Sequence, residues 1–446
     1  ACGAARRVPV DVPVGVTAHL MSIPYRILTR RPANLRPVRT VRSRVLAVLV
    51  VALGAMTLLG AAPSAAQTAC SQQVAPPPPV DSSEAPAPGT ALPSPMPVPD
   101  RPVGGPRMGE CGLILPAGAP APPAGISSMS WLIADAGSGD VLATKDPHAR
   151  NRPASTLKLF TALLAADQLP TDRVVVGTQA DADQDGSRVG IGPGGRYTVR
   201  QLLTGLFLVS GNDAAHALAG QLGGVTATVE QMNELAARLG ALDTRAATPS
   251  GLDGPGMSAS AYDLALAFRQ VLSRPLLVEL MGTKQANFPG YGKRPGFVVS
   301  NDNKLLSTYP GALGGKTGFT DDARHTQLDA AQRGGRRLIV VLMRGEQRPV
   351  SMSEQAARLL NYGFALAPGH PVGQLVDEAP PADTASPDGA PGAIAAPPGA
   401  GVNAASRNST AGFGQGGALL PVALWIGLAI AVLAGLGALV SRGRHR

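Results

Sequence analysis

Ser155 and Lys158 are the first residues along the chain whose types and spacing could do chemistry together. We expect an apolar helix that opens here, runs through Ala166 and ends before Pro170. Three residues apart, the two side chains share one face of that helix. A serine becomes a good nucleophile beside a base, and a lysine can be that base when burial lowers its pKa.

Lysine is rare in this chain, which makes its position here informative. Only six of the 39 basic residues are lysines, so arginine is the usual cation. An arginine cannot lose its proton in a protein and could not act as a base at position 158. A serine followed by a lysine is nevertheless a common surface pattern, so further motifs are needed.

Two later stretches carry polar groups of the kinds that could complete a site. The first, Ser210-Gly-Asn212, breaks an expected helix over 198–208 and leads into another. The second, Lys316-Thr-Gly-Phe319, lies in a glycine-rich strand, which indicates close approach of a ligand or of another backbone. Taken alone, the first stretch could be ordinary turn chemistry.

Elements with clear patterns surround these motifs. We expect a β-hairpin over 130–144, a helix over 221–239, a strand over 337–343 and a helix over 353–362. The globular part therefore runs from about 125 to 365, which is enough for one sizeable domain, or one with a helical subdomain.

We expect no metal or phosphate site in this chain. The stretch 181–186 starts like a calcium loop, but Gly192 stands where a bidentate glutamate is required. The stretch 190–195 lacks the Lys-Ser/Thr of a phosphate loop. The six histidines have no metal-ligand spacing, and His216 is expected to pack on its helix.

Both ends of the chain have the composition of export and membrane segments. Residues 1–66 combine a basic region, an apolar run over 45–59 and small residues, which predicts a secretory signal peptide cleaved after Ala66, with an uncleaved anchor as the alternative. Residues 418–440 are uncharged and long enough to span a bilayer. The basic tail 441–446 is expected in the cytoplasm, which leaves the bulk of the chain on the cell-wall side.

These segments also account for the net charge of +9. Residues 1–44 contribute 9 − 1 = +8 and the tail contributes +3, which leaves 9 − 11 = −2 for everything between. The basic character therefore gives no support for nucleic-acid binding.

Low-complexity stretches flank the globular part. Residues 67–124 are rich in proline and are expected to form an extended stalk. Cys70 and Cys111 are an even pair in an exported chain, and we expect them to form a disulfide. Residues 366–417 are rich in Ala, Pro and Gly and are expected to link the domain to the membrane helix.

The order of the three motifs is similar to that of the penicillin-binding proteins and serine β-lactamases. The motifs are Ser155-x-x-Lys158, Ser210-x-Asn212 and Lys316-Thr-Gly318. The stretches 247–265 and 361–364 also resemble low-molecular-mass D-alanyl-D-alanine carboxypeptidases, above all the actinobacterial and mycobacterial ones. The resemblance covers about 125–364. It implies an α/β (α+β) domain with an antiparallel five-stranded sheet flanked by helices and a helical subdomain.

The resemblance also implies roles for the polar residues in cleaving the terminal D-alanine from peptidoglycan stem peptides. Ser155 would be the nucleophile and Lys158 its general base. Ser210 would relay a proton to the leaving D-alanine, and Asn212 would hold Lys158 and the substrate amide. No cofactor is implied, and β-lactams would be covalent inhibitors.

Substrate binding would fall to the glycine-rich strand. Lys316 and Thr317, followed by Gly318, would bind the terminal carboxylate of an extended peptide. The backbone N–H groups of Ser155 and Phe319 would form the oxyanion hole.

One stretch departs from the family pattern. Arg324 stands where glycine is usual, and Gln327 and Asp329 are polar residues in a core strand. A buried, unpaired Asp is costly. We therefore expect either a more exposed strand or a weakened enzyme.

Two other functions stay open. A β-lactamase of the same fold would need a deacylating glutamate, and Glu230 and Glu234 lie on an expected helix that does not resemble the loop that carries it. A non-catalytic penicillin-binding sensor or scaffold is the second, and the stretch from Arg324 to Asp329 is what favours it.

Overall fold

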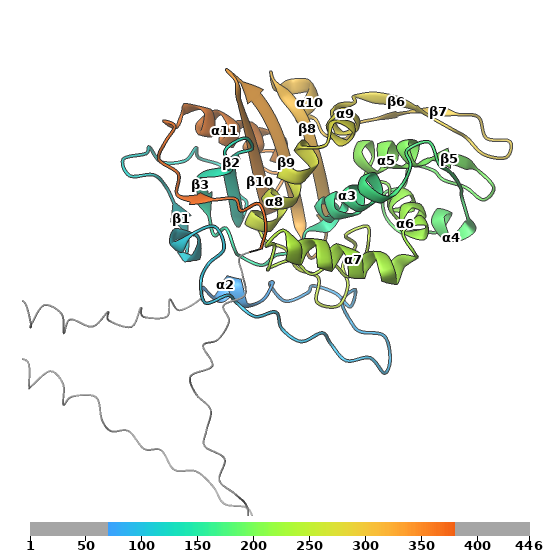
Figure 1. The fold of residues 1–446 in the computed structure, drawn as a ribbon, viewed down its shortest axis with the longest axis horizontal. Coiled ribbons are helices and arrows are strands. Elements are labelled where there is room, and N and C mark those ends of the chain that lie inside the picture. Colours follow the sequence, from blue (N-terminus) through green and yellow to red (C-terminus); the bar gives the residue numbers. More distant parts are fainter. Residues whose placement is uncertain (1–69, 380–446) are drawn as a thin grey trace, which may run out of the picture. The chain divides into compact units, whose positions relative to one another are not determined.

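The computed structural model describes residues 70–379 (Figure 1). The predicted signal peptide, most of the linker, the predicted membrane helix over 418–440 and the basic tail lie outside the described residues. Within the described part, no helix has the length and apolar character needed to cross a membrane.

A seven-stranded antiparallel sheet forms the centre, in the order β1-β3-β2-β10-β9-β8, with β11 also paired to β3. Its strands are β1 (Leu113–Ile114), β2 (Ser130–Asp135), β3 (Asp140–Lys145), β8 (Ala312–Thr320), β9 (Arg324–Arg333), β10 (Arg336–Gly345) and β11 (Gly373–Gln374). The predicted antiparallel sheet is confirmed. The expected five strands are the long ones, and the two-residue strands β1 and β11 extend the sheet beyond β3.

Helices cover both faces of the sheet. They are α2 (Ser71–Val74), η1 (Pro106–Gly109), η2 (Ala154–Leu157), α3 (Lys158–Gln168), α4 (Gln179–Ala182), α5 (Val199–Leu208), α6 (Asn212–Gln221), α7 (Val225–Arg238), α8 (Ala261–Leu272), α9 (Pro275–Gly282), α10 (Leu305–Thr308) and α11 (Met352–Ala365). Two small hairpins complete the described fold: β4 (Val174–Val176) with β5 (Arg196–Thr198), and β6 (Gln285–Phe288) with β7 (Phe297–Ser300).

Alternation along the central strands builds two cores. Leu132 of β2 and Ile339 of β10 face a cluster that includes α3, α5 and α8. Their neighbours Ile133 and Val340 point the other way and pack against α11. Figure 1 shows the helical subdomain of α3 to α7 beside the sheet on the side of β8.

Local signals fix where these helices start. Thr198 caps α5 and forms a capping box with Gln201. The predicted helix over 221–239 starts only at Val225, because Gly223 and Gly224 adopt positive φ angles of 101° and 96° that end the preceding helix.

Residues 70–124 differ from the expected stalk. They are extended, as their proline content requires, but they lie against the domain. The disulfide between Cys70 and Cys111 closes this segment, and β1 within it pairs with β3. The buried Arg150 donates hydrogen bonds to the carbonyl groups of Val74, Met96 and Pro97. Since a buried guanidinium needs acceptors, these carbonyl groups hold the segment in place.

The domain also extends past the expected boundary at 365. Leu366, Val372 and Leu375 are buried, and β11 pairs with β3. The linker therefore starts later than its composition indicated, because apolar residues within a polar stretch reach back to the core.

The stretch that departed from the family pattern is not an exposed strand. Gln327 and Asp329 are buried in β9. Asp329 accepts hydrogen bonds from Asn303 Nδ2 at 2.5 Å and from Gln327 Nε2 at 2.7 Å. Arg324 is half-buried at the β8–β9 turn and pairs with Glu346. The expectation of greater exposure was wrong, because amide partners satisfy the buried carboxyl group.

Candidate active site

Ser155 lies in the single 3-10 turn η2, and Lys158 is the first residue of α3. Lys158 Nζ lies 2.7 Å from Ser155 Oγ, 2.6 Å from Asn212 Oδ1 and 2.7 Å from the carbonyl oxygen of Ser250. Asn212 and Ser250, which lie 54 and 92 positions after Lys158 in the chain, thus both contact its amine.

The environment of Lys158 favours its neutral form. The side chain is fully buried. Burial is the main reason that its pKa is well below the ordinary value, and the positive charge of Lys316 lowers the pKa further. A neutral amine keeps two N–H groups for the oxygens of Asn212 and Ser250, which leaves its lone pair for the hydroxyl of Ser155. The site can therefore take the proton from Ser155.

The second motif starts helix α6. Ser210 is buried at the lip of the cleft, with a left-handed φ of 59°. Asn212 is the first residue of α6, and its Nδ2 donates to the carbonyl oxygen of Asp185 at 2.6 Å. This bond fixes the amide orientation, so that Asn212 Oδ1 faces Lys158.

Asp213, in the first turn of α6, organises the loop beside this motif, a role that sequence reasoning missed. Its buried carboxylate accepts backbone N–H groups from Val189 at 2.9 Å, Gly190 at 2.7 Å and Ile191 at 3.0 Å. The glycine-rich stretch once compared with a phosphate loop therefore wraps an internal carboxylate. The role of Asp213 could not be read from the sequence, because its partners are backbone N–H groups, which every residue except proline carries.

The third motif lies on β8, along one wall of the cleft. Lys316 is buried, and Nζ donates to the carbonyl oxygen of Thr317 at 2.6 Å. Burial lowers the pKa of Lys316 to about 7, and the charge of Asp302 opposes that shift. Thr317, Gly318 and Phe319 line the cleft itself.

Backbone geometry brings β8 against Ser155. A Cβ atom placed on Gly318 would lie 2.8 Å from the backbone nitrogen of Ser155. Ala154 has a left-handed φ of 48°, a conformation that costs energy for a residue with a side chain. Gly251 allows this, because a Cβ there would lie 2.0 Å from the carbonyl oxygen of Ala154. Ser155 and Phe319 thereby lie beside one cleft.

The cleft has an empty volume of about 1430 Å³ and a lining in which polar and apolar surface are about equal. Ser155, Ser210, Asn212, Thr317, Gly318 and Phe319 all line it. The side chains of Lys158 and Lys316 lie buried behind these residues. The residues of all three motifs thus meet in one place.

Comparisons with known proteins agree with this geometry. Residues 117–347, more than half of the chain, match the family described as D-alanyl-D-alanine carboxypeptidase. The chain is 46% identical to D-alanyl-D-alanine carboxypeptidase DacB2 of Mycobacterium tuberculosis over 266 residues, which are 59% of this chain and 90% of that one. The chain belongs to this family.

Solved structures of relatives extend the likeness to the fold. A D-alanyl-D-alanine carboxypeptidase structure from Mycobacterium tuberculosis is 45% identical and covers 59% of this chain and all of that one, with a TM-score of 0.57. A Streptomyces DD-transpeptidase variant is 31% identical and covers 55% of this chain, with a TM-score of 0.52. This chain spans 64% of the length of DacF of Bacillus subtilis, which is less than two thirds.

The predicted family and enzyme class are confirmed: the chain is a serine D-Ala-D-Ala carboxypeptidase. The β-lactamase alternative loses ground, since Glu230 and Glu234 lie on α7 and not on a loop at the cleft. The sensor alternative also loses its main support, because the unusual stretch of β9 is fully hydrogen-bonded.

His216 of the carboxypeptidase lies on α6 and pairs with Asp181, with 2.6 Å between Nδ1 and Oδ1. It does not line the cleft. The pairing agrees with the expectation of a packed histidine.

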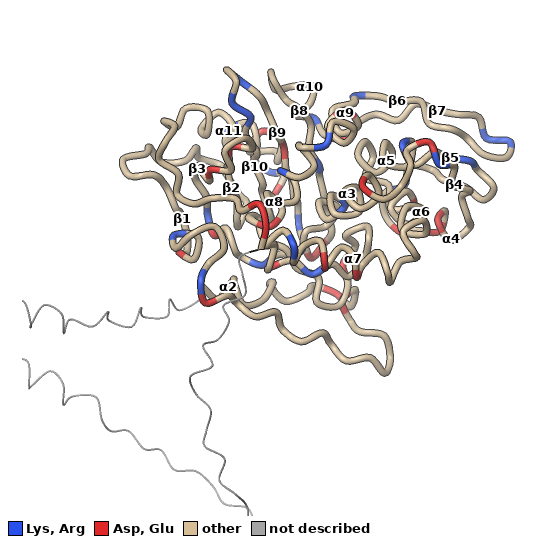
Figure 2. The backbone as a smooth tube through the Cα atoms, viewed as in Figure 1, with Lys and Arg blue, Asp and Glu red and all other residues tan. Residues whose placement is uncertain are grey.

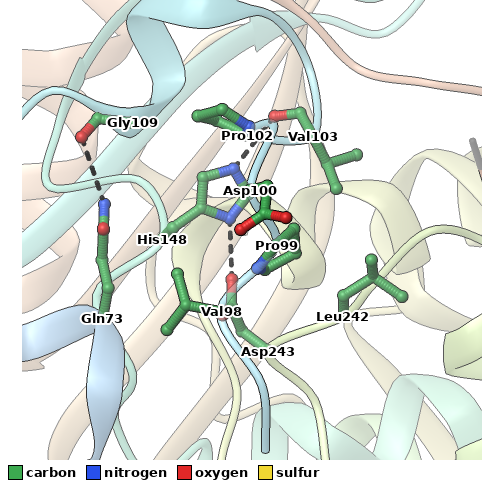
Figure 3. A pocket seen from close by; sticks show the side chains of 10 residues that line it. All are labelled: Gln73, Val98, Pro99, Asp100, Pro102, Val103, Gly109, His148, Leu242 and Asp243. Carbon is green, nitrogen blue, oxygen red and sulfur yellow. Dashed lines mark hydrogen bonds and ion pairs between the residues drawn. The ribbon is translucent and has the colours of Figure 1, made fainter. Parts of the chain in front are cut away.

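A buried cluster of His148, Asp243 and Asp263 is the only group in the described residues with metal-like spacing. Figure 3 shows both ring nitrogens of His148 already bonded, Nδ1 to Asp243 at 2.7 Å and Nε2 to the carbonyl oxygen of Val103 at 3.0 Å. Asp243 also accepts from Arg150. The cluster is an internal ion pair, because its histidine has no lone pair left for a metal.

Figure 2 shows acidic and basic residues interspersed over the described elements, with basic residues in the β6–β7 turn.

Proposed function

We propose that this carboxypeptidase removes the terminal D-alanine of peptidoglycan stem peptides through an acyl-enzyme on Ser155. One observation carries the proposal: Lys158 is fully buried, and its Nζ lies 2.7 Å from Ser155 Oγ. A burial-depressed pKa makes the amine a base, and the distance is a hydrogen-bonding one.

Acylation would proceed as follows. Ser155 Oγ attacks the carbonyl carbon of the penultimate D-alanine as Lys158 takes the hydroxyl proton. The N–H groups of Ser155 and Phe319 stabilise the oxyanion. The C–N bond then breaks, and the nitrogen of the leaving D-alanine receives a proton from Lys158 through the hydroxyl of Ser210.

Deacylation would reverse these roles with water. Lys158, neutral again, takes a proton from a water molecule that attacks the ester carbonyl. The ester C–O bond breaks, and the proton returns to Ser155 Oγ. Asn212 keeps Lys158 in place throughout, because Asp185 fixes its amide.

Selection of a free C-terminus would depend on Lys316. A protonated amine beside β8 favours a terminal carboxylate over an internal peptide bond. Thr317 adds a hydroxyl on the cleft side. This preference supports carboxypeptidase action over cleavage of cross-links.

β-Lactams are proposed as covalent inhibitors of the same serine. Their carboxylate would bind near Lys316 and Thr317, and their strained amide would acylate Ser155. We also propose a single-pass membrane protein, with the catalytic domain on the cell-wall side and the helix over 418–440 as its anchor. The apolar sequence of that segment and the arginines after it support this placement.

The test is D-alanine release from a synthetic peptide that ends in D-Ala-D-Ala. We expect steady release by the full-length chain, loss of release in Ser155→Ala, and unchanged release in Ser138→Ala, an exposed serine of the β2–β3 turn. A fluorescent penicillin should label the wild type and Ser138→Ala but not Ser155→Ala. Release that persists in folded Ser155→Ala would contradict the proposal.

A further inference from the structure

The N-terminal segment reaches the active-site backbone through a short stretch that we call the proline strap, residues 76–84. It lies outside 117–347, the part that matches the family. Figure 1 shows the segment that contains it, in blue after α2, running beneath α7. The family match therefore says nothing about the contacts of the proline strap.

The first contact of the proline strap is with Arg152, three residues before the nucleophile. Both carboxylate oxygens of Glu84 accept from the Arg152 guanidinium, with 2.8 Å between Nη2 and Oε2. The carbonyl oxygen of Pro77 accepts from Nη1. The side chain of Arg152 is 3% exposed and that of Glu84 is 12% exposed. A bidentate pair shielded in this way is strong and fixes orientation.

The second contact is with the turn that joins β8 to β9. The N–H of Val80 donates to Asp322 Oδ1, and the hydroxyl of Ser83 donates to Asp322 Oδ2 at 3.3 Å. Asp322 is buried. Its carbonyl oxygen accepts from Arg344 Nη1 at 2.5 Å. The proline strap is therefore bonded to a turn that is itself anchored to β10.

These two contacts lie on either side of the proposed oxyanion hole. Arg152 leads through Pro153 into the left-handed Ala154 and then Ser155. On the other side, β8 ends at Thr320, one residue after Phe319 and two before Asp322. A hydrogen bond from Thr326 Oγ1 to the carbonyl oxygen of Pro153, at 2.9 Å, also ties the start of η2 to β9.

We propose that Glu84 is a positioning residue for acyl transfer: through Arg152, the proline strap holds the strained turn at Ala154 in register with the end of β8. This rests on the proposed function, because it takes Ser155 and Phe319 as the groups to be aligned. A strained backbone persists only where its surroundings over-determine it, and the strap supplies part of that restraint from outside the family region.

The charge pattern explains why Glu84 and not Arg152 is the residue to change. Arg152 lies among three acidic side chains, those of Glu84, Asp322 and Asp253, and Arg344 is a second cation beside Asp322. Removing the arginine would leave these acids facing one another, and the fold itself would suffer. Glu84→Gln keeps the shape of the contact and removes one charge.

The experiment compares Glu84→Gln with Glu110→Gln in the full-length chain. Glu110 is the matched control, since it pairs with Arg107 in the same N-terminal segment but is only half-buried and does not line the cleft. D-Alanine release is followed over substrate concentration, and kcat is expressed per mole of folded protein by circular dichroism. We expect kcat to fall about tenfold or more in Glu84→Gln, with KM within about twofold, and both constants to stay unchanged in Glu110→Gln.

Val80→Pro is the second variant. This substitution removes the N–H group that donates a hydrogen bond to Asp322, and it leaves every carboxylate in place. A proline is compatible with this position, because residue 80 follows a run of prolines. The same fall in kcat is expected, of smaller size. If Glu84→Gln does not fold, this variant decides by the same criterion.

Two results would overturn the proposal. The positioning role alone would be refuted if the wild type releases D-alanine and folded Glu84→Gln has the same kcat as the wild type. If Glu84→Gln does not fold, the same result with folded Val80→Pro would refute it. No release by folded wild type would refute the proposed function as well, so the two failures are distinguishable.

Discussion

Lys158 and Lys316 are both buried at the cleft, and the charge of Lys316 lowers the pKa of Lys158 after the larger effect of burial. The pKa of Lys316 is itself lowered to about 7 by burial, against the opposing charge of Asp302. Two lysines in one site can then hold different protonation states near neutral pH. In the proposed mechanism, Lys158 is the base and Lys316 binds the substrate carboxylate.

This relationship predicts a bell-shaped dependence of kcat/KM on pH. Activity should rise as Lys158 loses its proton and fall as Lys316 loses its own near pH 7. A bound substrate carboxylate favours the charged form of Lys316, so the falling limb of kcat should lie at higher pH than that of kcat/KM. Rates measured from pH 5 to 10 check this. A kcat/KM that stays level to pH 10 would contradict it.

Lys158→Arg should abolish turnover. The longer guanidinium stays charged and cannot accept the proton of Ser155. We expect kcat to fall by about 10³-fold or more, with the protein still folded. Steady-state D-alanine release and a thermal melt of the same sample check both points. As the control, Lys145→Arg on β3 should retain full activity.

Lys316→Arg separates charge from proton transfer. The arginine keeps the positive charge, so kcat/KM should no longer fall near pH 7, although its larger group should raise KM a few-fold. Lys316→Met should instead raise KM by about 10- to 100-fold below pH 7, where the wild-type amine is charged, since a charged hydrogen bond contributes about 1.5–3 kcal/mol. A falling limb that survives in Lys316→Arg would assign it to another group.

Asp213→Ala should lower stability more than a typical substitution. It removes the acceptor for buried N–H groups of Val189, Gly190 and Ile191. Each unsatisfied donor costs about 1–3 kcal/mol. We expect the free energy of unfolding to fall by about 3 kcal/mol or more in urea titrations, and by under about 0.5 kcal/mol in the control Asp183→Ala, a residue at the surface-exposed end of α4.

The raised pKa of Asp329 leads us to expect that stability depends on pH. Burial raises its pKa from 3.8 to about 7. Between about pH 4 and 7 the unfolded chain ionises this carboxyl group and the folded chain does not, so stability falls as pH rises through that window. Asp329→Asn should reduce the difference between urea unfolding free energies at pH 5 and pH 8. An equal difference in both proteins would show that Asp329 does not titrate in this range.

Much of this site could be predicted from the sequence, because its chemistry lies in short local motifs. A serine and a lysine one helical turn apart must share a face, and an apolar helix must be buried. That pattern made Ser155 and Lys158 candidates, and the two later motifs distinguished them from a common surface pattern. Lys316 was recognisable because a lysine in a glycine-rich strand has few purely structural explanations.

The rest depended on contacts between distant residues. Nothing in the sequence around Ser250 indicates that its carbonyl group holds Lys158. The amide partners of Asp329 lie on another segment and on its own strand, so a local pattern showed only an unpaired acid. The proline-rich segment looked like a stalk for the same reason: its acceptors for Arg150 are backbone carbonyl groups, which every sequence has.

The pairing of β1 and β11 with β3 has a consequence for how the protein meets other chains. An unpaired edge strand is a template onto which another molecule can add, and thus a route to aggregation. Here β1 covers one end of β3 and β11 covers the other. Along the sheet path, the far edge is β8, whose residues line the cleft. The sheet thus has one edge closed to unwanted partners, while the opposite edge strand lines the cleft.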